Sequence, residues 1–169
     1  MLMLGLATIR AAQRGDSVAL AELHAEAWRY AYRGIIPGVA LERMISRRGP
    51  AWWAAQCGPR YGTLVAAFNR RVVGYATFGR SRMDVSPATG EIYELYVNPE
   101  CHGAGFGRAL FEESRRRLRE RNMTGLVVWA LAENDLASGF YEAMGGKARF
   151  RTVDRLGGAR LEKTGFHWG

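Results

Sequence analysis

The residues with the clearest chemistry form a glycine-rich turn between His102 and Arg108. The turn contains three alternate glycines, Gly103, Gly105 and Gly107. It follows a strand-like segment at 91–97 and precedes a run with helical spacing. Glycines lack Cβ atoms and let a ligand approach the backbone, and the free N–H groups of a helix start attract an anion. An ordinary tight turn needs only one or two glycines, so three favour a phosphate-binding cradle.

The spacing of the turn narrows the kind of ligand. Gly-x-Gly-x-Gly differs from the Gly-x-Gly-x-x-Gly pattern of dinucleotide-binding turns, and no Gly-Lys-Ser/Thr follows as in a P-loop. Arg108 falls in the first turn of the expected helix, where a positive charge opposes the helix dipole. A bound anion would compensate that charge, which again indicates phosphate.

A second motif occupies residues 134–145, Asn-Asp-Leu-Ala-Ser-Gly-Phe-Tyr-Glu-Ala-Met-Gly. On a helix, Asn134, Ala137 and Tyr141 lie on one face, because they stand at i, i+3 and i+7. At about 1.5 Å of rise per residue, the ends of this set are about 10 Å apart along the axis. Taken alone, Phe140 and Tyr141 would fit equally well as core residues with a satisfied hydroxyl.

Together the two motifs resemble those of the GNAT superfamily of N-acetyltransferases. The family signature is Arg/Gln-x-x-Gly-x-Gly/Ala after a strand, followed by Asn-x-x-Ala-x-x-Phe-Tyr-x-x-x-Gly. This chain has His102 where the family has Arg or Gln, while Gly105 and Gly107 match. The resemblance is close over 63–144 and covers the first 60 residues only in layout.

The resemblance implies a mixed α/β (α+β) fold in a single N-acetyltransferase domain over 1–169. Its central sheet would be twisted, mostly antiparallel, flanked by helices, and split at the cofactor site between the strand ending at Val97 and the strand at 126–130. Acetyl-CoA would be the co-substrate, with no metal. The residues expected to contact it are Leu95, Tyr96, Val97, His102, Gly103, Ala104, Gly105, Phe106, Gly107, Arg108, Asn134, Ala137 and Tyr141.

The implied reaction is acetyl transfer to a primary amine of a small molecule or peptide, directly within a ternary complex. A protonated amine needs a general base, and Glu94 or Glu91 could serve. Strand alternation turns these two carboxylates to opposite faces unless a bulge intervenes, and Glu94 lies nearer the expected thioester. The alternative for Glu94 is a surface carboxylate paired with an arginine. A backbone N–H of Leu95 or Tyr96 would bind the oxyanion, and Tyr141 would protonate the departing thiolate.

These motifs require elements that position them, and the sequence predicts the order βααα-βββ-αβ-αββ. The expected strands are 8–11, 63–68, 72–78, 91–97, 126–130, 147–153 and 159–166. The expected helices begin at Asp16 or Ser17, cover 39–46 and 50–56, follow the glycine turn, and start again after a cap at Asn134. On the long helix after the turn, Glu112 with Arg116 and Glu113 with Arg117 are expected as i,i+4 ion pairs.

Composition excludes several other classes of protein. The 169 residues, 48% of them hydrophobic, suffice for one core, and no apolar run has the roughly 18 residues of a membrane span. Cys57 and Cys101 form no Cys-x-x-Cys pair and the three histidines lack metal-ligand spacing, so neither zinc nor a disulfide is expected. The net charge of +8 comes from scattered arginines rather than a nucleic-acid-binding stripe. No signal peptide is recognised, so a cytoplasmic location is expected.

The acceptor is not encoded in a readable motif. Trp28 and Tyr32, with Glu94, are predicted to line its pocket, as that region does in the family, although the aromatic residues fit equally well in the core. A rival function is a non-catalytic acetyl-CoA-binding regulatory module. The last hairpin offers a surface for a homodimer, but no residue pattern requires one.

Overall fold

The computed structural model describes residues 7–84 and 86–169, and its elements follow the predicted order. They are β1 (Ala7–Ala11), η2 (Arg14–Asp16), α1 (Ser17–Tyr32), α2 (Gly38–Ser46), α3 (Pro50–Ala55), β2 (Thr63–Phe68), β3 (Arg71–Arg80), β4 (Gly90–Val97), η3 (Pro99–Cys101), α4 (Phe106–Glu120), β5 (Leu126–Leu131), α5 (Asp135–Ala143), β6 (Lys147–Leu156) and β7 (Ala159–Trp168). Strand β2 has the predicted bounds, whereas β3, β6 and β7 run two to three residues longer than predicted, because backbone pairing continues beyond the apolar stretches.

The strands form one sheet in the order β1-β2-β3-β4-β5-β7-β6. Every neighbouring pair is antiparallel except β4 with β5, which are joined through α4. The predicted mostly antiparallel α+β architecture is therefore confirmed.

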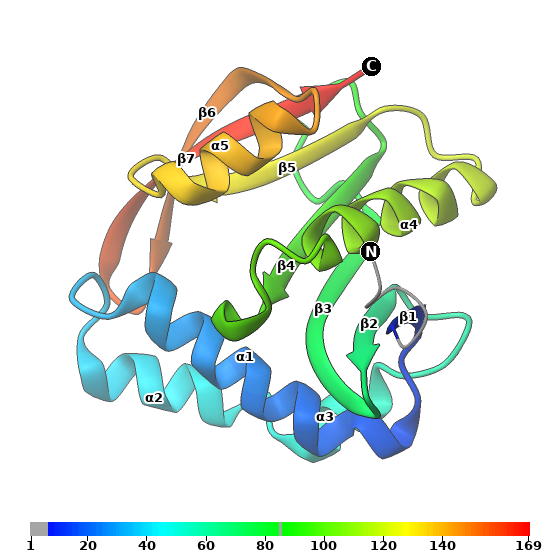
Figure 1. The fold of residues 1–169 in the computed structure, drawn as a ribbon. Coiled ribbons are helices and arrows are strands. Elements are labelled where there is room, and N and C mark those ends of the chain that lie inside the picture. The colour runs from blue at the N-terminus through cyan, green and yellow to red at the C-terminus, as the bar shows by residue number, and fades with distance from the viewer. Residues whose placement is uncertain (1–6, 85) are drawn as a thin grey trace.

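Helices cover both faces of the sheet (Figure 1). Leu64 packs with Leu110 and Phe111 of α4 in one buried cluster. Its neighbour Val65 packs with Leu20 of α1 and Trp53 of α3 in another. Adjacent strand residues point to opposite faces, so α4 lies on one side of the sheet and the α1–α3 pair on the other. Any site that uses both sides must pass through the sheet.

The sheet opens between β4 and β5. The two strands pair only from Gly90 to Ile92, and the rest of β4, up to Val97, has no partner on β5 in the described chain. The strands diverge beyond this point (Figure 1). Thr77 of β3 faces Glu94 while Phe78 faces Ile92, so Tyr93 is an extra residue on β4. Such a bulge bends the strand and increases its twist. The bulge at Tyr93 directly follows the last residue pair between β4 and β5, so the predicted split begins there.

The β6–β7 hairpin closes the sheet against α2. Leu156 and Ala159 pack on Ile36 and its cluster. At the hairpin tip, Gly157 has φ +59°, and a Cβ there would lie 2.6 Å from Ile36 Cγ2. The tip therefore needs glycine both for its conformation and for its close approach.

One predicted ion pair on α4 is wrong and the other is confirmed. Glu113 Oε1 lies 2.8 Å from Arg117 Nε, as expected. Arg116 pairs with Glu113 and Glu120 instead of Glu112, and Glu112 lies 3.8 Å from Arg108. A long arginine side chain reaches carboxylates at i−3 and i+4 equally well, so helical spacing alone does not select between them.

Candidate functional site

The glycine turn presents an open backbone surface at the start of α4. Gly103 and Gly105 have φ of +79° and +89°, and a Cβ on either would meet nothing within 4 Å. The first helical hydrogen bond runs from Ala109 N–H to Gly105 O. In the described chain, no acceptor takes the N–H groups of residues 106–108. This combination of unshielded main chain and free donors fits a diphosphate.

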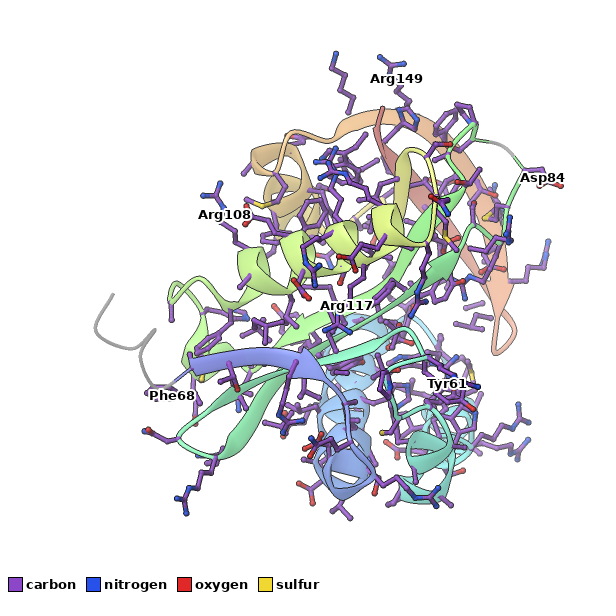
Figure 2. All side chains as sticks on the ribbon, turned by 90° about the vertical axis from the view of Figure 1, so that its right-hand side faces the viewer. Tyr61, Phe68, Asp84, Arg108, Arg117 and Arg149 are labelled. Atoms are coloured by element: carbon purple, nitrogen blue, oxygen red, sulfur yellow. The ribbon has the colours of Figure 1, made fainter. Side chains whose placement is uncertain are left out.

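Gly107 has a packing role, unlike Gly103 and Gly105, which face open space. A Cβ there would lie 3.3 Å from the ring of Phe140, so Gly107 sets the close packing of α4 on α5. Arg108 extends outward from the start of α4, with its side chain 63% exposed (Figure 2). Among the described residues, its one ion-pair partner within 4.0 Å is Glu112, at 3.8 Å. Arg108 is thus free to meet an anion at the helix start.

His102 is turned back toward β4. Its Nε2 lies 3.0 Å from the carbonyl oxygen of Val97, which is a hydrogen bond donated by the ring in the Nε2–H tautomer. The family residue at this position is Arg or Gln, and here the histidine fastens the turn to the strand end. The open side of the turn is consequently lined by backbone rather than by this side chain.

The free edge of β4 offers backbone groups to the gap. Asn98 N–H donates to Val73 O on β3 at 2.7 Å. Backbone direction alternates along a strand, so Tyr96 also faces β3, whereas Leu95 and Val97 face the gap. Of the three consecutive residues predicted to bind the cofactor, the outer two therefore present N–H and C=O groups to the space between β4 and β5.

Asn134 caps α5, as predicted. Its Oδ1 accepts the N–H of Ala137 at 3.0 Å, which stabilises the helix start and leaves the side-chain NH₂ free. Ala137 is partly buried against the main core. The cap fixes the beginning of the helix face that also carries Tyr141.

Tyr141 lies among aromatic rings in the core on the α4 side. It packs against Phe140, Phe166 and Trp168, with ring centroids 5.2, 5.7 and 6.1 Å away. The residue is 7% exposed, and its hydroxyl has no hydrogen bond to any described residue. Burial raises the pKa of the phenol well above its usual value, so the phenol stays protonated at neutral pH.

Glu94 occupies the other face, below the open part of β4. Its carboxylate accepts hydrogen bonds from Arg48 Nη1 at 2.6 Å and from the Tyr75 hydroxyl at 2.7 Å. Tyr75 is fully buried, and burial, reinforced by the neighbouring Glu94 charge, raises the pKa of its phenol. The Glu94 side chain nevertheless remains 21% exposed.

Glu91 lies on the same face as Glu94, contrary to simple strand alternation. Ile92 and Leu95 both pack in the α4-side core, although three positions separate them, because Tyr93 is the bulged residue. Glu91 is 1% exposed and accepts both the Arg82 N–H at 3.0 Å and Arg82 Nη2 at 2.8 Å. Its oxygens are therefore already satisfied within the protein.

Aromatic residues of α1 and α3 surround the Glu94 carboxylate and its arginine. The Arg48 guanidinium lies 5.5 Å from the Trp28 ring and 4.7 Å from the Trp52 ring. Tyr32 packs on Trp28 at 5.2 Å, and burial raises the pKa of its phenol to about 12. Trp28, Tyr32 and Glu94, the predicted acceptor residues, are thus brought together. Tyr30, from the same aromatic segment, is 70% exposed and stays outside.

His24 is a buried titratable group beneath this cluster. It is 0% exposed, and neither ring nitrogen has a hydrogen-bond partner among the described residues. It packs between Trp28 and Trp53. Burial lowers the pKa of His24 to about 4, so the ring is neutral near pH 7.

Sequence reasoning missed four residues of this cluster: Arg48, Trp52, Tyr75 and His24. Arg48 stands in a run of two arginines that carries no motif, and Glu94 lies 46 positions further along the chain. Tyr75 and His24 stand among apolar residues in the sequence, so their context predicts core residues rather than site residues. Within residues 7–84 and 86–169, no group of three or more His, Cys, Asp or Glu side chains could hold a metal ion. Nor does any helix of that part have the length and apolarity to cross a membrane.

Comparison with known sequences identifies relatives along nearly the whole chain. Residues 18–146 match the sequence model of the Acetyltransferase (GNAT) family. The Uncharacterized N-acetyltransferase YuaI of Bacillus subtilis is 27% identical over 164 residues, covering 96% of this chain and 93% of that one. Mycothiol acetyltransferase of Kocuria rhizophila is 32% identical over 63% of this chain, which spans only 35% of that longer protein.

Solved structures show the same fold. The structure of yncA of Salmonella typhimurium, solved with its cofactor acetyl-CoA, superimposes with a TM-score of 0.69 at 24% identity, covering 96% of this chain and 93% of that one. The PaiA N-acetyltransferase of Thermoplasma acidophilum, solved with coenzyme A, gives 0.69 at 18% identity, with 94% and 97% covered. At these identities the likeness concerns the fold.

Proposed function

The chain belongs to the acetyltransferase (GNAT) family, and we propose that it transfers the acetyl group of acetyl-CoA directly to a primary amine of a small molecule or peptide. The observation that carries this proposal is the open glycine turn beside the gap between β4 and β5. The two superimposed structures that contain CoA or acetyl-CoA support it. The relatives are named as enzymes, so they do not support the alternative function of a non-catalytic regulatory module.

Three parts of the chain are suited to hold the cofactor. The N–H groups of residues 106–108 and the bare backbone of Gly103 and Gly105 suit the diphosphate. The free edge at Leu95 and Val97 suits the amides of the pantetheine arm, which would pair as an added strand does. Acetyl-CoA supplies the acetyl thioester.

The proposed chemistry uses both faces of the sheet. Glu94 accepts a proton from the ammonium of the acceptor, and the freed amine forms a C–N bond as the C–S bond breaks. The Leu95 N–H stabilises the negative charge on the carbonyl oxygen. Tyr141 donates its proton to the departing sulfur, and the phenolate regains a proton from the nitrogen of the tetrahedral adduct, so that free CoA thiol and a neutral amide are formed. Because burial raises the pKa of this phenol, the donor proton is present throughout the working pH range.

Calorimetry with acetyl-CoA tests the cradle. In Gly105→Ala, a Cβ would stand on the open surface of the turn at a positive φ, and we expect acetyl-CoA to bind at least tenfold more weakly, the loss of about one good hydrogen bond to a charged group. Gly158→Ala is the matched control, because it has φ +83° and equally open space at the remote β6–β7 hairpin. That control should lose similar stability yet keep full affinity.

Failure of the wild-type chain to bind acetyl-CoA would refute the proposed function. Equal loss of affinity in the two glycine variants would instead show that backbone strain, rather than ligand contact, weakens binding.

A cytoplasmic location and a homodimer through the β6–β7 hairpin stay predictions. Cys57 and Cys101 are both free thiols, which is typical of a reducing compartment.

A further inference from the structure

The Arg48 guanidinium has an unused recognition edge. Nη1 donates to Glu94, while Nε and Nη2 have no hydrogen bond to any residue within 7–84 and 86–169. These two nitrogens form one side of the guanidinium fork, the side that binds a carboxylate with two parallel hydrogen bonds. The Arg48 side chain is partly exposed, at 32% of its surface, so it is not sealed within the core.

The surrounding structure holds that edge in place. The rings of Trp28 and Trp52 stack on the guanidinium, and the 2.6 Å contact to Glu94 fixes its rotation. A guanidinium fixed in this way loses little conformational entropy when it binds a second anion.

The charges around the cluster are balanced, which limits the acceptor. Glu94 is paired with Arg48, and Asp154 on β6 is paired with Lys163 on β7 at 3.2 Å. His24 is neutral near pH 7, because burial lowers its pKa to about 4. A polyamine or an aminoglycoside would bring several positive charges to a cluster whose central carboxylate, Glu94, is already paired with Arg48. A zwitterion brings one charge of each sign.

We propose that the acceptor is a primary amine with a carboxylate beside its amino group, a free α-amino acid being the simplest case. This inference rests on the proposed function, since it names the substrate class of the same site. The carboxylate binds the Nε–Nη2 edge of Arg48, and the ammonium binds Glu94, which takes its proton before the amine forms the C–N bond. Trp28, Trp52 and Tyr32 offer apolar surface to the side chain of the acceptor.

A matched series of acceptors tests this assignment on the wild-type chain. The twenty common amino acids are screened by release of free CoA, and the best is compared with its carboxamide, its decarboxylated amine and spermidine. We expect kcat/KM to be about ten- to a hundredfold higher for the amino acid than for the two analogues, as expected for hydrogen bonds to a charged group. Calorimetry in the presence of CoA should show the amino acid binding and the carboxamide not binding measurably.

Two arginine variants separate recognition from structural support. Arg48→Lys keeps a positive charge next to Glu94 and loses the planar fork, so KM for the amino acid should rise about tenfold or more, and the preference for the amino acid over its carboxamide, measured as the ratio of the two kcat/KM values, should fall by a similar factor. Arg82→Lys, at the other arginine–glutamate pair of β4, should leave the preference for the carboxylate unchanged. Melting temperatures of both variants establish that they fold.

Equal kcat/KM for the amino acid and its carboxamide would overturn the inference, as would efficient acetylation of spermidine with none of the amino acids. So would an Arg48→Lys variant that slows all acceptors by the same factor, since that is the behaviour of a structural ion pair. Each of these results leaves acetyl-CoA binding intact, whereas the absence of acetyl-CoA binding refutes the proposed function itself.

Discussion

Two glutamate–arginine pairs stand three residues apart on β4, and their surroundings differ. Glu91 lies where β4 is still paired with β5, and its side chain is 1% exposed. Glu94 lies beyond the point where the strands separate, and its side chain is 21% exposed. Both carboxylates face the same side of the sheet and both have an arginine within 2.8 Å. The residue types are the same, so the departure of β5 is what makes the difference.

The comparison indicates that the exposure of the carboxylates on this strand follows the opening of the sheet. At Glu91, main-chain and side-chain donors of Arg82 take both carboxylate oxygens and close the site. At Glu94, the partners are the Arg48 and Tyr75 side chains, and the carboxylate stays partly exposed. We therefore assign support of the fold to the first pair and proton transfer to the second.

The largest expected difference is in kcat/KM between Glu94→Gln and Glu91→Gln, in which an amide replaces each carboxylate. In Glu94→Gln, kcat/KM should fall about a hundredfold or more, the usual contribution of a general base, and the acidic limb of the pH–rate profile should flatten. In Glu91→Gln, kcat/KM should stay within about threefold, while the free energy of unfolding falls by about 1–3 kcal/mol, because a buried hydrogen bond to a charged group is weakened. Steady-state kinetics and urea unfolding measure both. If Glu91→Gln alone abolished turnover, the two assignments would be reversed.

Tyr141 extends the comparison to the far side of the gap. Tyr141→Phe removes the hydroxyl while keeping the ring among Phe140, Phe166 and Trp168. We expect kcat to fall about ten- to a hundredfold with an acetyl-CoA dissociation constant unchanged within about threefold. Single-turnover kinetics and calorimetry give the two numbers. Unchanged turnover at saturating substrate would remove Tyr141 from the reaction.

The smallest effect near pH 7 is expected at His24, which packs against Trp28 and Trp53 beneath the Glu94–Arg48 pair. Burial lowers the pKa of His24 to about 4, so the unfolded chain binds a proton first as the pH falls. Stability should therefore decline by up to about 3 kcal/mol between pH 6.5 and pH 4. In His24→Leu, this part of the pH dependence should disappear, with stability near pH 7 preserved because neither ring nitrogen has a partner in the described chain. Urea unfolding at several pH values measures it, and an unchanged slope would contradict the buried neutral histidine.

The sequence predicts the elements well because their signals are local. Apolar periodicity marks α1 and α4, and the glycine turn and the Asn134 cap mark the two helix starts nearest the gap. The same local signals carry the resemblance to the GNAT superfamily. The split between β4 and β5 came from that resemblance, since neither strand carries a sign of it.

The remainder depends on contacts between distant parts of the chain. Residues 90–97 read as an uninterrupted strand, and only the register with β3 reveals Tyr93 as the extra residue that places Glu91 and Glu94 on one face. Arg48 meets Glu94 across 46 positions, through the packing of α3 and its preceding loop beneath the sheet. The turn of His102 toward Val97 likewise depends on how η3 closes the corner. No pattern of spacing encodes these approaches.

The short parallel ladder between β4 and β5 has a mechanical consequence. Within the sheet, three residue pairs, Gly90 with Leu126 through Ile92 with Val128, join the four strands β1–β4 to the three strands β5, β7 and β6. A molecule bound between the diverging strands would contact both parts of the sheet and hold them together. The melting temperature should therefore increase when the gap is occupied, and it should rise with ligand concentration as mass action requires.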